Sequence, residues 1–165
     1  MPKHRNPIAT RHSTPQPRLI TPTETARLVE SFVFGALGRG RSVEQFLGPA
    51  GDADTLGISW VEVVPTHSGF KDVLHTAADV GSEGFCDLGE FPPLDADDED
   101  EEFGREIAKV MAAPDAVALA EARTGAVRGR WVNEGVTQDE YRDFLRAGRP
   151  RHWPPTDDAS VDHDE

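Results

Sequence analysis

Three residues in the middle of the chain carry side chains suited to nucleophilic or metal chemistry, namely His67, His75 and Cys86. A cysteine thiolate beside a histidine base is a nucleophile, and the same three side chains can bind zinc. Their spacing matches neither a C-x-x-C nor an H-x-x-x-H motif, and a cysteine in an apolar strand is usually a small buried hydrophobic residue. They support only an alternative hypothesis, that the protein is a small hydrolase or a metal-dependent enzyme. We expect no metal and no cofactor.

A second feature is the acidic run, residues 95–102, in which seven of eight residues are Asp or Glu. Asp95, Asp97 and Glu99 fit three positions of a calcium loop, but Asp100 stands where its sharp turn requires glycine. Unpaired charges are costly to bury, so the run is expected to be exposed. We predict that it forms a partner-binding surface through its carboxylates, Asp95, Asp97, Asp98, Asp100, Glu101 and Glu102.

The remaining motifs argue against nucleotide and nucleic-acid binding. The only glycine cluster, residues 35–40, follows a predicted helix, whereas a phosphate-binding loop must precede one. Ser68 lacks the G-x-S-x-G surroundings of a nucleophile elbow. Five basic residues resemble the layout of a winged helix-turn-helix, but the acidic charge of the chain repels phosphate. These residues, which we expect to pair with the acidic run, are Arg105, Lys109, Arg123, Arg128 and Arg130.

The length and charge predict one acidic domain between two tails. The chain has 165 residues, with 30 acidic and 17 basic side chains and a net charge of −13. Residues 1–20 and 148–165 are rich in proline and poor in apolar residues, so we expect both to be disordered. Without these tails, which are basic and acidic respectively, a charge of −14 remains on residues 21–147, the expected folded domain.

Two helical segments are predicted before the first strand. Thr21 to Glu24 form a capping box, apolar residues then repeat at helical spacing, and Gly38 ends the helix. A second, weaker box at residues 42–45 predicts one helical turn, with Phe46 and Leu47 facing inward. Residues 48–51, which contain two glycines and a proline, end this turn.

A β-meander is predicted in the middle of the chain. Residues 57–65 are rich in β-branched and aromatic types and end at a proline, which is typical of a strand. Residues 70–80 fit both a helix and a strand, and the turn residues on either side favour a strand. Residues 85–88 are predicted to form the third strand.

Helices dominate the predicted C-terminal part. The acidic run is expected to lead into a helix with Phe103, Ile107, Val110 and Met111 on its apolar face. Pro114 restarts a helix that ends at Gly125, residues 127–132 form a short strand with Trp131, and a capping box at residues 137–140 opens a final helix. The predicted class is α+β, with a small antiparallel meander packed against several helices.

These observations favour a protein-binding module over an enzyme. An acidic domain associates rapidly with basic partners, so we expect an acidic adaptor, inhibitor or immunity/antitoxin-like protein with a basic protein partner. The single cysteine forbids an internal disulfide, and neither an apolar signal segment nor a membrane-spanning run is present in the sequence. We therefore expect a cytoplasmic protein without membrane contact. The sequence leaves the partner's identity and the oligomeric state open.

Overall fold

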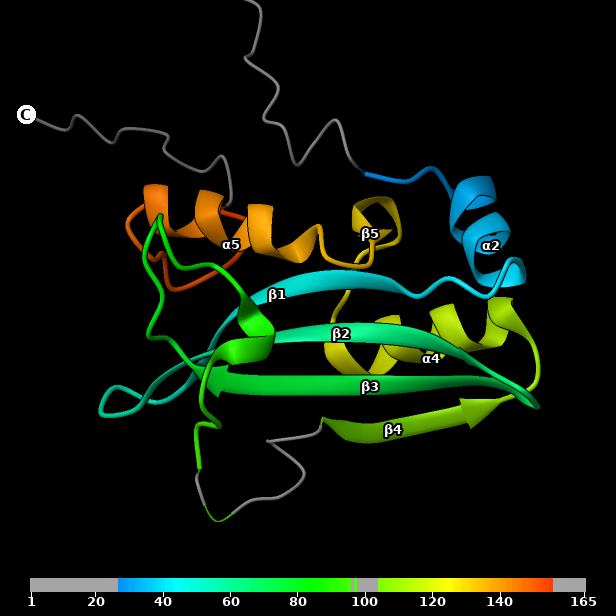
Figure 1. The fold of residues 1–165 in the computed structure, drawn as a ribbon, viewed down its shortest axis with the longest axis horizontal. Helices are drawn as coiled ribbons and strands as arrows, with labels where there is room; N and C mark the ends of the chain where they lie inside the picture. Colours follow the sequence, from blue (N-terminus) through cyan, green and yellow to red (C-terminus); the bar gives the residue numbers. More distant parts are fainter. Residues whose placement is uncertain (1–26, 96, 98–103, 156–165) are drawn as a thin grey trace, which may run out of the picture.

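The protein is built on a five-stranded antiparallel sheet with helices on both of its faces (Figure 1). The computed structural model describes residues 27–95, 97 and 104–155. Strands β1 to β4 form a meander and β5 lies outside β1, so the strand order is β4-β3-β2-β1-β5. The predicted class, an α+β fold with an antiparallel meander, is confirmed.

The central hairpin forms where the sequence predicts it. β2 spans Leu56–Thr66 and β3 spans Gly69–Ala78, with the turn at residues 67 and 68. The register pairs Trp60 with His75. Because side chains alternate along a strand, Trp60 faces one layer of the core and Val61 the other. The ambiguous segment 70–80 is therefore a strand through Ala78.

β1 (Val43–Gly51) occupies the segment for which the sequence predicts a helical turn, so that prediction is wrong. The strand pairs with β2 along its whole length, with one irregularity after Phe46. Its first four residues are all buried, because helices or loops cover both faces of the sheet here. Such a strand lacks the alternation that distinguishes strands from helices in a sequence.

The prediction of a third strand at residues 85–88 is also wrong. Residues 85–88 contribute only an isolated bridge between Ser82 and Phe85, followed by the 3-10 helix η1 (Leu88–Glu90). The fourth strand of the meander is β4 (Arg105–Val110), in place of the predicted helix. A bulge in its pairing with β3 leaves out Ile107. The bulge places Ile107 and Val110 on the same face, which imitates helical spacing.

In the part of the chain that the structure describes, three α-helices complete the fold. α2 spans Glu30–Gly38 and ends where the sequence predicts, although the capping box at residues 21–24 lies outside the described residues. α4 spans Ala113–Thr124 and ends at Gly125, whose φ of +78° is the left-handed conformation that favours glycine. α5 spans Thr137–Arg146, where the final helix is predicted, but the predicted capping box does not form, because Val136 is the N-cap and the Thr137 hydroxyl donates to Glu44. None of the helices in the described ranges is long and apolar enough to cross a membrane.

The predicted strand at residues 127–132 is mostly a turn. Residues Arg128–Arg130 form the 3-10 helix η2, and β5 contains only Val132–Asn133. Trp131 lies between them and is fully buried. The two residues of β5 pair with the start of β1, so this short strand places the following loop and α5 beside β1.

Each face of the sheet has its own apolar core. On the face covered by α2 and α4, Trp131 packs with valines and alanines of the sheet and helices. On the other face, Phe46, Trp60, Tyr141 and Phe144 pack with the segment before β4. Trp153, from the segment 148–155, also packs on this second core. Figure 1 shows α4 behind the sheet and η1 in front of it.

Candidate functional site

The structure does not bring the three candidate catalytic residues together. His67 is exposed in the turn between β2 and β3, whereas His75 lies six residues after Gly69 on β3, about 20 Å further along the strand. Cys86 is only 6% exposed, and its thiol donates to the carbonyl oxygen of Ser82 at 3.0 Å. Cys86 is thus buried, as expected, but in a loop rather than in a strand.

The acidic run lies mostly outside the described residues. Asp95 and Asp97 are described and exposed, and the backbone N–H of Asp97 donates to the carboxylate of Asp95 at 3.0 Å. Asp98, Asp100, Glu101 and Glu102 belong to the part that the structure does not describe.

The described residues on either side of the run, Leu94 and Gly104, both pack closely on the sheet. Leu94 packs so closely on the start of β2 that a Cβ at Gly57 would lie 2.9 Å from its Cδ2 atom. Gly104 has a φ of +84°, and a Cβ added there would lie 2.7 Å from Nδ1 of His75. Gly104, the first described residue after the run, therefore lies directly beside His75.

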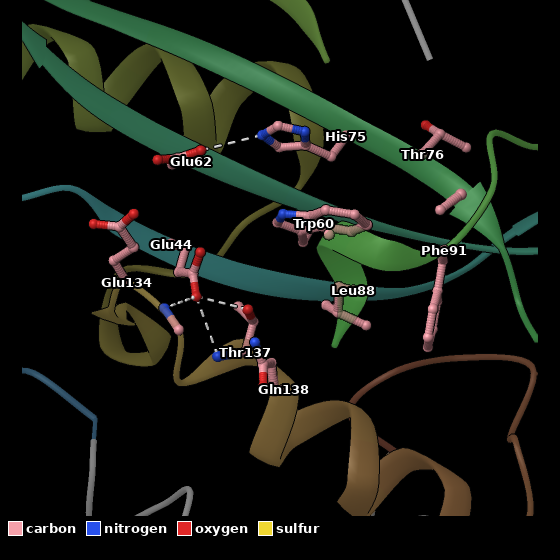
Figure 2. A pocket seen from close by; sticks show the side chains of 13 residues that line it. Glu44, Trp60, Glu62, His75, Thr76, Leu88, Phe91, Glu134, Thr137 and Gln138 are labelled. Carbon is pink, nitrogen blue, oxygen red and sulfur yellow. Dashed lines mark hydrogen bonds and ion pairs between the residues drawn. The ribbon is translucent and has the colours of Figure 1, made fainter. Parts of the chain in front are cut away.

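A pocket of about 320 Å³ opens on this face of the sheet, where α5 begins (Figure 2). Strands β1, β2 and β3 contribute Glu44, Trp60, Glu62 and His75, and the loop before α5 contributes Glu134. Figure 2 shows the glutamates at one end of the pocket and the apolar side chains of η1 and its neighbour Phe91 at the other. None of the described residues that line it is a lysine or an arginine.

Glu44 lies at the base of the pocket and is 5% exposed. Its Oε1 atom accepts three hydrogen bonds, from the N–H of Gly135 at 2.6 Å and from the N–H and the hydroxyl of Thr137 at 3.3 and 2.6 Å. The other oxygen accepts none from the described residues and points away from these donors (Figure 2). Burial raises the pKa of Glu44, and the hydrogen bonds from Thr137 and Gly135 oppose that rise.

Glu62 has the opposite environment. Its Oε2 atom lies 3.1 Å from Nε2 of His75, and the imidazole stacks on Trp60 with ring centroids 4.8 Å apart and planes at 9°. The hydrogen bond with His75 lowers the pKa of Glu62, against a smaller opposing effect of burial, and a hydrogen bond with Ser42 lowers it further. Glu62 is therefore held as a carboxylate in a fixed position.

Glu44 and Glu62 are direct neighbours across the β1–β2 pair, because the register places one opposite the other. Like charges at such positions repel, and Glu62 contributes to the raised pKa of Glu44. Glu134 adds a third, exposed carboxylate at the edge of the pocket, where it also borders a second cavity with Arg39 and Arg41. The pocket can accept a cation, or transfer protons between groups of different pKa.

Glu44, Glu62 and Trp60 are not among the candidate site residues that the sequence predicts. The sequence places Glu44 in a predicted helix capping box, whereas in the structure it pairs with β2 as part of a strand. One signal was available for Glu62, because it interrupts an otherwise apolar segment of a correctly predicted strand. A charged residue in such a segment needs a partner or a function. The contact with Thr137 could not be found from spacing, since 93 residues separate the two positions.

No group of three or more His, Cys, Asp or Glu residues within the described ranges is arranged to hold a metal ion. Comparison with known proteins adds no assignment to the pocket, because no protein-family model, curated protein or solved structure matches the chain.

Proposed function

We propose that the protein is a non-enzymatic, acidic protein-binding module, of the adaptor, inhibitor or immunity/antitoxin-like kind, whose partner is a basic protein. The observation that carries this proposal is the convergence of Glu44, Glu62 and Glu134 on one pocket without a lysine or arginine in its lining. Even with His75 protonated, the lining side chains would keep an excess of negative charge. A basic side chain of a partner supplies the missing charge.

The acidic run strengthens the same surface. Gly104, two residues after the last carboxylate of the run in the sequence, lies beside His75, and His75 lines the pocket. The sequence places seven carboxylates in this run, six of which we propose as partner-binding residues. Clustered negative charge accelerates the association of a basic partner, while a defined pocket provides the specific contact.

A second candidate function is acid–base catalysis in the same pocket, as in a small hydrolase. It is favoured by the opposite pKa shifts of Glu44 and Glu62, since paired groups of different pKa are typical of a proton donor and a proton acceptor. In this form of the hypothesis, His75 acts with the two glutamates, because His67 lies at the far end of the hairpin.

Panning of a random peptide library displayed on phage tests the binding proposal. We expect the wild-type protein to enrich peptides with a surplus of Arg and Lys, and Glu62→Gln to abolish that enrichment. Glu30→Gln is the matched control, because it makes the same charge change on α2, which covers the opposite face of the sheet. Enrichment of neutral or acidic peptides, or the same basic peptides on Glu62→Gln, would contradict the proposal.

A further inference from the structure

We infer that the pocket formed by Glu44, Trp60 and Glu62 holds the side chain of a single arginine, with its guanidinium between the two carboxylates. This inference names the ligand group of the site and rests on the proposed function, recognition of a basic protein. Three features support it: the free oxygen of Glu44, the fixed carboxylate of Glu62, and a pocket whose ends and volume match an arginine side chain.

The free oxygen of Glu44 is the first observation. All three internal donors reach Oε1, and the second oxygen of this almost completely buried carboxylate accepts no hydrogen bond from the described residues. Figure 2 shows that oxygen turned toward the side where Glu62 lies. This oxygen is not among the fully buried atoms without a partner, and Glu44 lines the pocket, so a donor from a ligand can reach it and complete its hydrogen bonding.

The second observation is that Glu62 offers a prepositioned carboxylate directly across the strand pair. His75 and Ser42 both hydrogen-bond to its side chain, so Glu62 loses little conformational freedom when a ligand binds. Two carboxylates on neighbouring strands suit a guanidinium, which presents five N–H donors in one plane. A guanidinium is also more weakly hydrated than an ammonium group, so it enters a half-closed pocket at lower cost.

The third observation is that the pocket, like an arginine side chain, has one charged end and one apolar end. Its carboxylates lie at one end, whereas Leu88 and Phe91 line the other (Figure 2). The alkyl part of an arginine side chain packs on apolar surface while its charged end stays with polar partners. A volume of about 320 Å³ is at the lower end of the range for ligand pockets, which suits one side chain rather than a peptide segment.

Titration with propylguanidinium, followed by NMR, tests the inference. This ion reproduces the end of an arginine side chain, and the reporters are the indole N–H of Trp60 and the amides of Gly135 and Thr137. We expect saturable shifts at these groups, with affinity reduced roughly tenfold in Glu62→Gln because one charge-assisted interaction is lost. Glu44→Gln should weaken binding as well, since its amide oxygen can still accept from Thr137 while its NH₂ group faces the cation.

Three controls make the outcome decisive. Glu30→Gln should bind propylguanidinium like the wild type, and the neutral analogue propylurea should cause no saturable shift. Butylammonium, which resembles lysine, should bind more weakly than propylguanidinium. Equal binding of propylurea, tighter binding of butylammonium, or unchanged affinity in Glu62→Gln would overturn the inference.

The two proposals fail in different ways. Without any binding of propylguanidinium, the arginine inference fails, but Glu62-dependent enrichment of basic peptides would still support the proposed function. If propylguanidinium binds in the pocket while no basic peptide is enriched, recognition of a basic protein fails, and the inferred guanidinium site stands alone.

Discussion

Asp72 is a charged residue whose burial must affect stability. It lies on β3 with 0% exposure, and neither carboxylate oxygen has a hydrogen-bond partner among the described residues. Burial raises the pKa of Asp72 to about 7, although the positive charge of Arg123 opposes the shift. Because the folded-state pKa lies above the ordinary value of 3.8, the folded state favours the neutral acid.

The contribution of Asp72 to the free energy of unfolding should therefore be highest below about pH 4, where Asp72 is neutral in the folded state, and should fall as the pH rises to about 7. We expect Asp72→Asn to remove this pH dependence and to be more stable than the wild type at pH 8, by up to about 4 kcal/mol. Urea unfolding at pH 5 and pH 8 measures the difference. If the free energy of unfolding of Asp72→Asn differs between pH 5 and pH 8 as much as that of the wild type, Asp72 is not the origin of the pH dependence.

Because Glu44 is buried in the pocket, we expect the affinity for a ligand, and not only the stability, to depend on pH. The pKa of Glu44 is raised by burial, so Glu44 loses its negative charge at a higher pH than an exposed glutamate does. We expect the affinity for propylguanidinium to increase with pH as Glu44 ionises. Comparison with Glu44→Gln separates this effect from any effect of the other ionisable groups that line the pocket, His75, Glu62 and Glu134. A wild-type profile identical to that of Glu44→Gln would contradict the assignment.

At the scale of elements, the accuracy of the sequence interpretation depended on how each strand is buried. The sequence predicts β2 because its residues are β-branched and aromatic, and β3 because turn residues lie on either side of it. β1 was missed because both of its faces are covered, and β4 because its bulge gives Ile107 and Val110 a helical spacing. Both causes lie in tertiary packing, which local patterns do not contain. The pocket was missed for the same reason, since Glu44 belongs to β1.

The segment after α5 should stabilise the domain through Trp153. The indole stacks edge-on against Phe144 and Phe46, at centroid distances of 5.6 and 6.3 Å, and its N–H donates to Glu140 at 2.8 Å. We expect Trp153→Ala, or a chain that ends at residue 147, to lower the free energy of unfolding by about 2–3 kcal/mol. Chemical denaturation measures this loss.

Cooperative unfolding should remain in both variants, because the two cores keep their other residues. The exposed residue Arg151 offers a matched control, since Arg151→Ala shortens a side chain in the same segment outside either core. Stability equal to that of the wild type after truncation at residue 147 would show that Trp153 contributes nothing to the fold.

At the scale of the whole molecule, the net charge of −13 should control association kinetics. Neutralising Asp97, Asp98, Asp100 and Glu101 to Asn or Gln should leave stability unchanged or slightly higher at low salt, with the difference decreasing as salt is added. The same change should slow association with a basic peptide selected from the library and reduce the salt dependence of that rate. Stopped-flow measurements at several salt concentrations provide the test.

A calcium site in the acidic run predicts a different result. Calcium would then raise the melting temperature of the wild type at millimolar concentration, magnesium would not, and the neutralised variant would lose the effect. We expect no calcium-specific stabilisation. A large one would contradict the interpretation of the run as a contact surface.

The hydrogen bonds between Glu44 and Thr137 have a consequence for the order in which the chain folds. They join positions 93 residues apart. β5, which also pairs with β1, likewise comes after α4 in the sequence. The β2–β3 hairpin closes through a turn of two residues and can form early, whereas β1 acquires its second neighbour only after residue 133 has been made. During synthesis on the ribosome, β1 therefore stays an open sheet edge until residue 133 has been made. Substitutions at Thr137 should accelerate unfolding more than they slow folding.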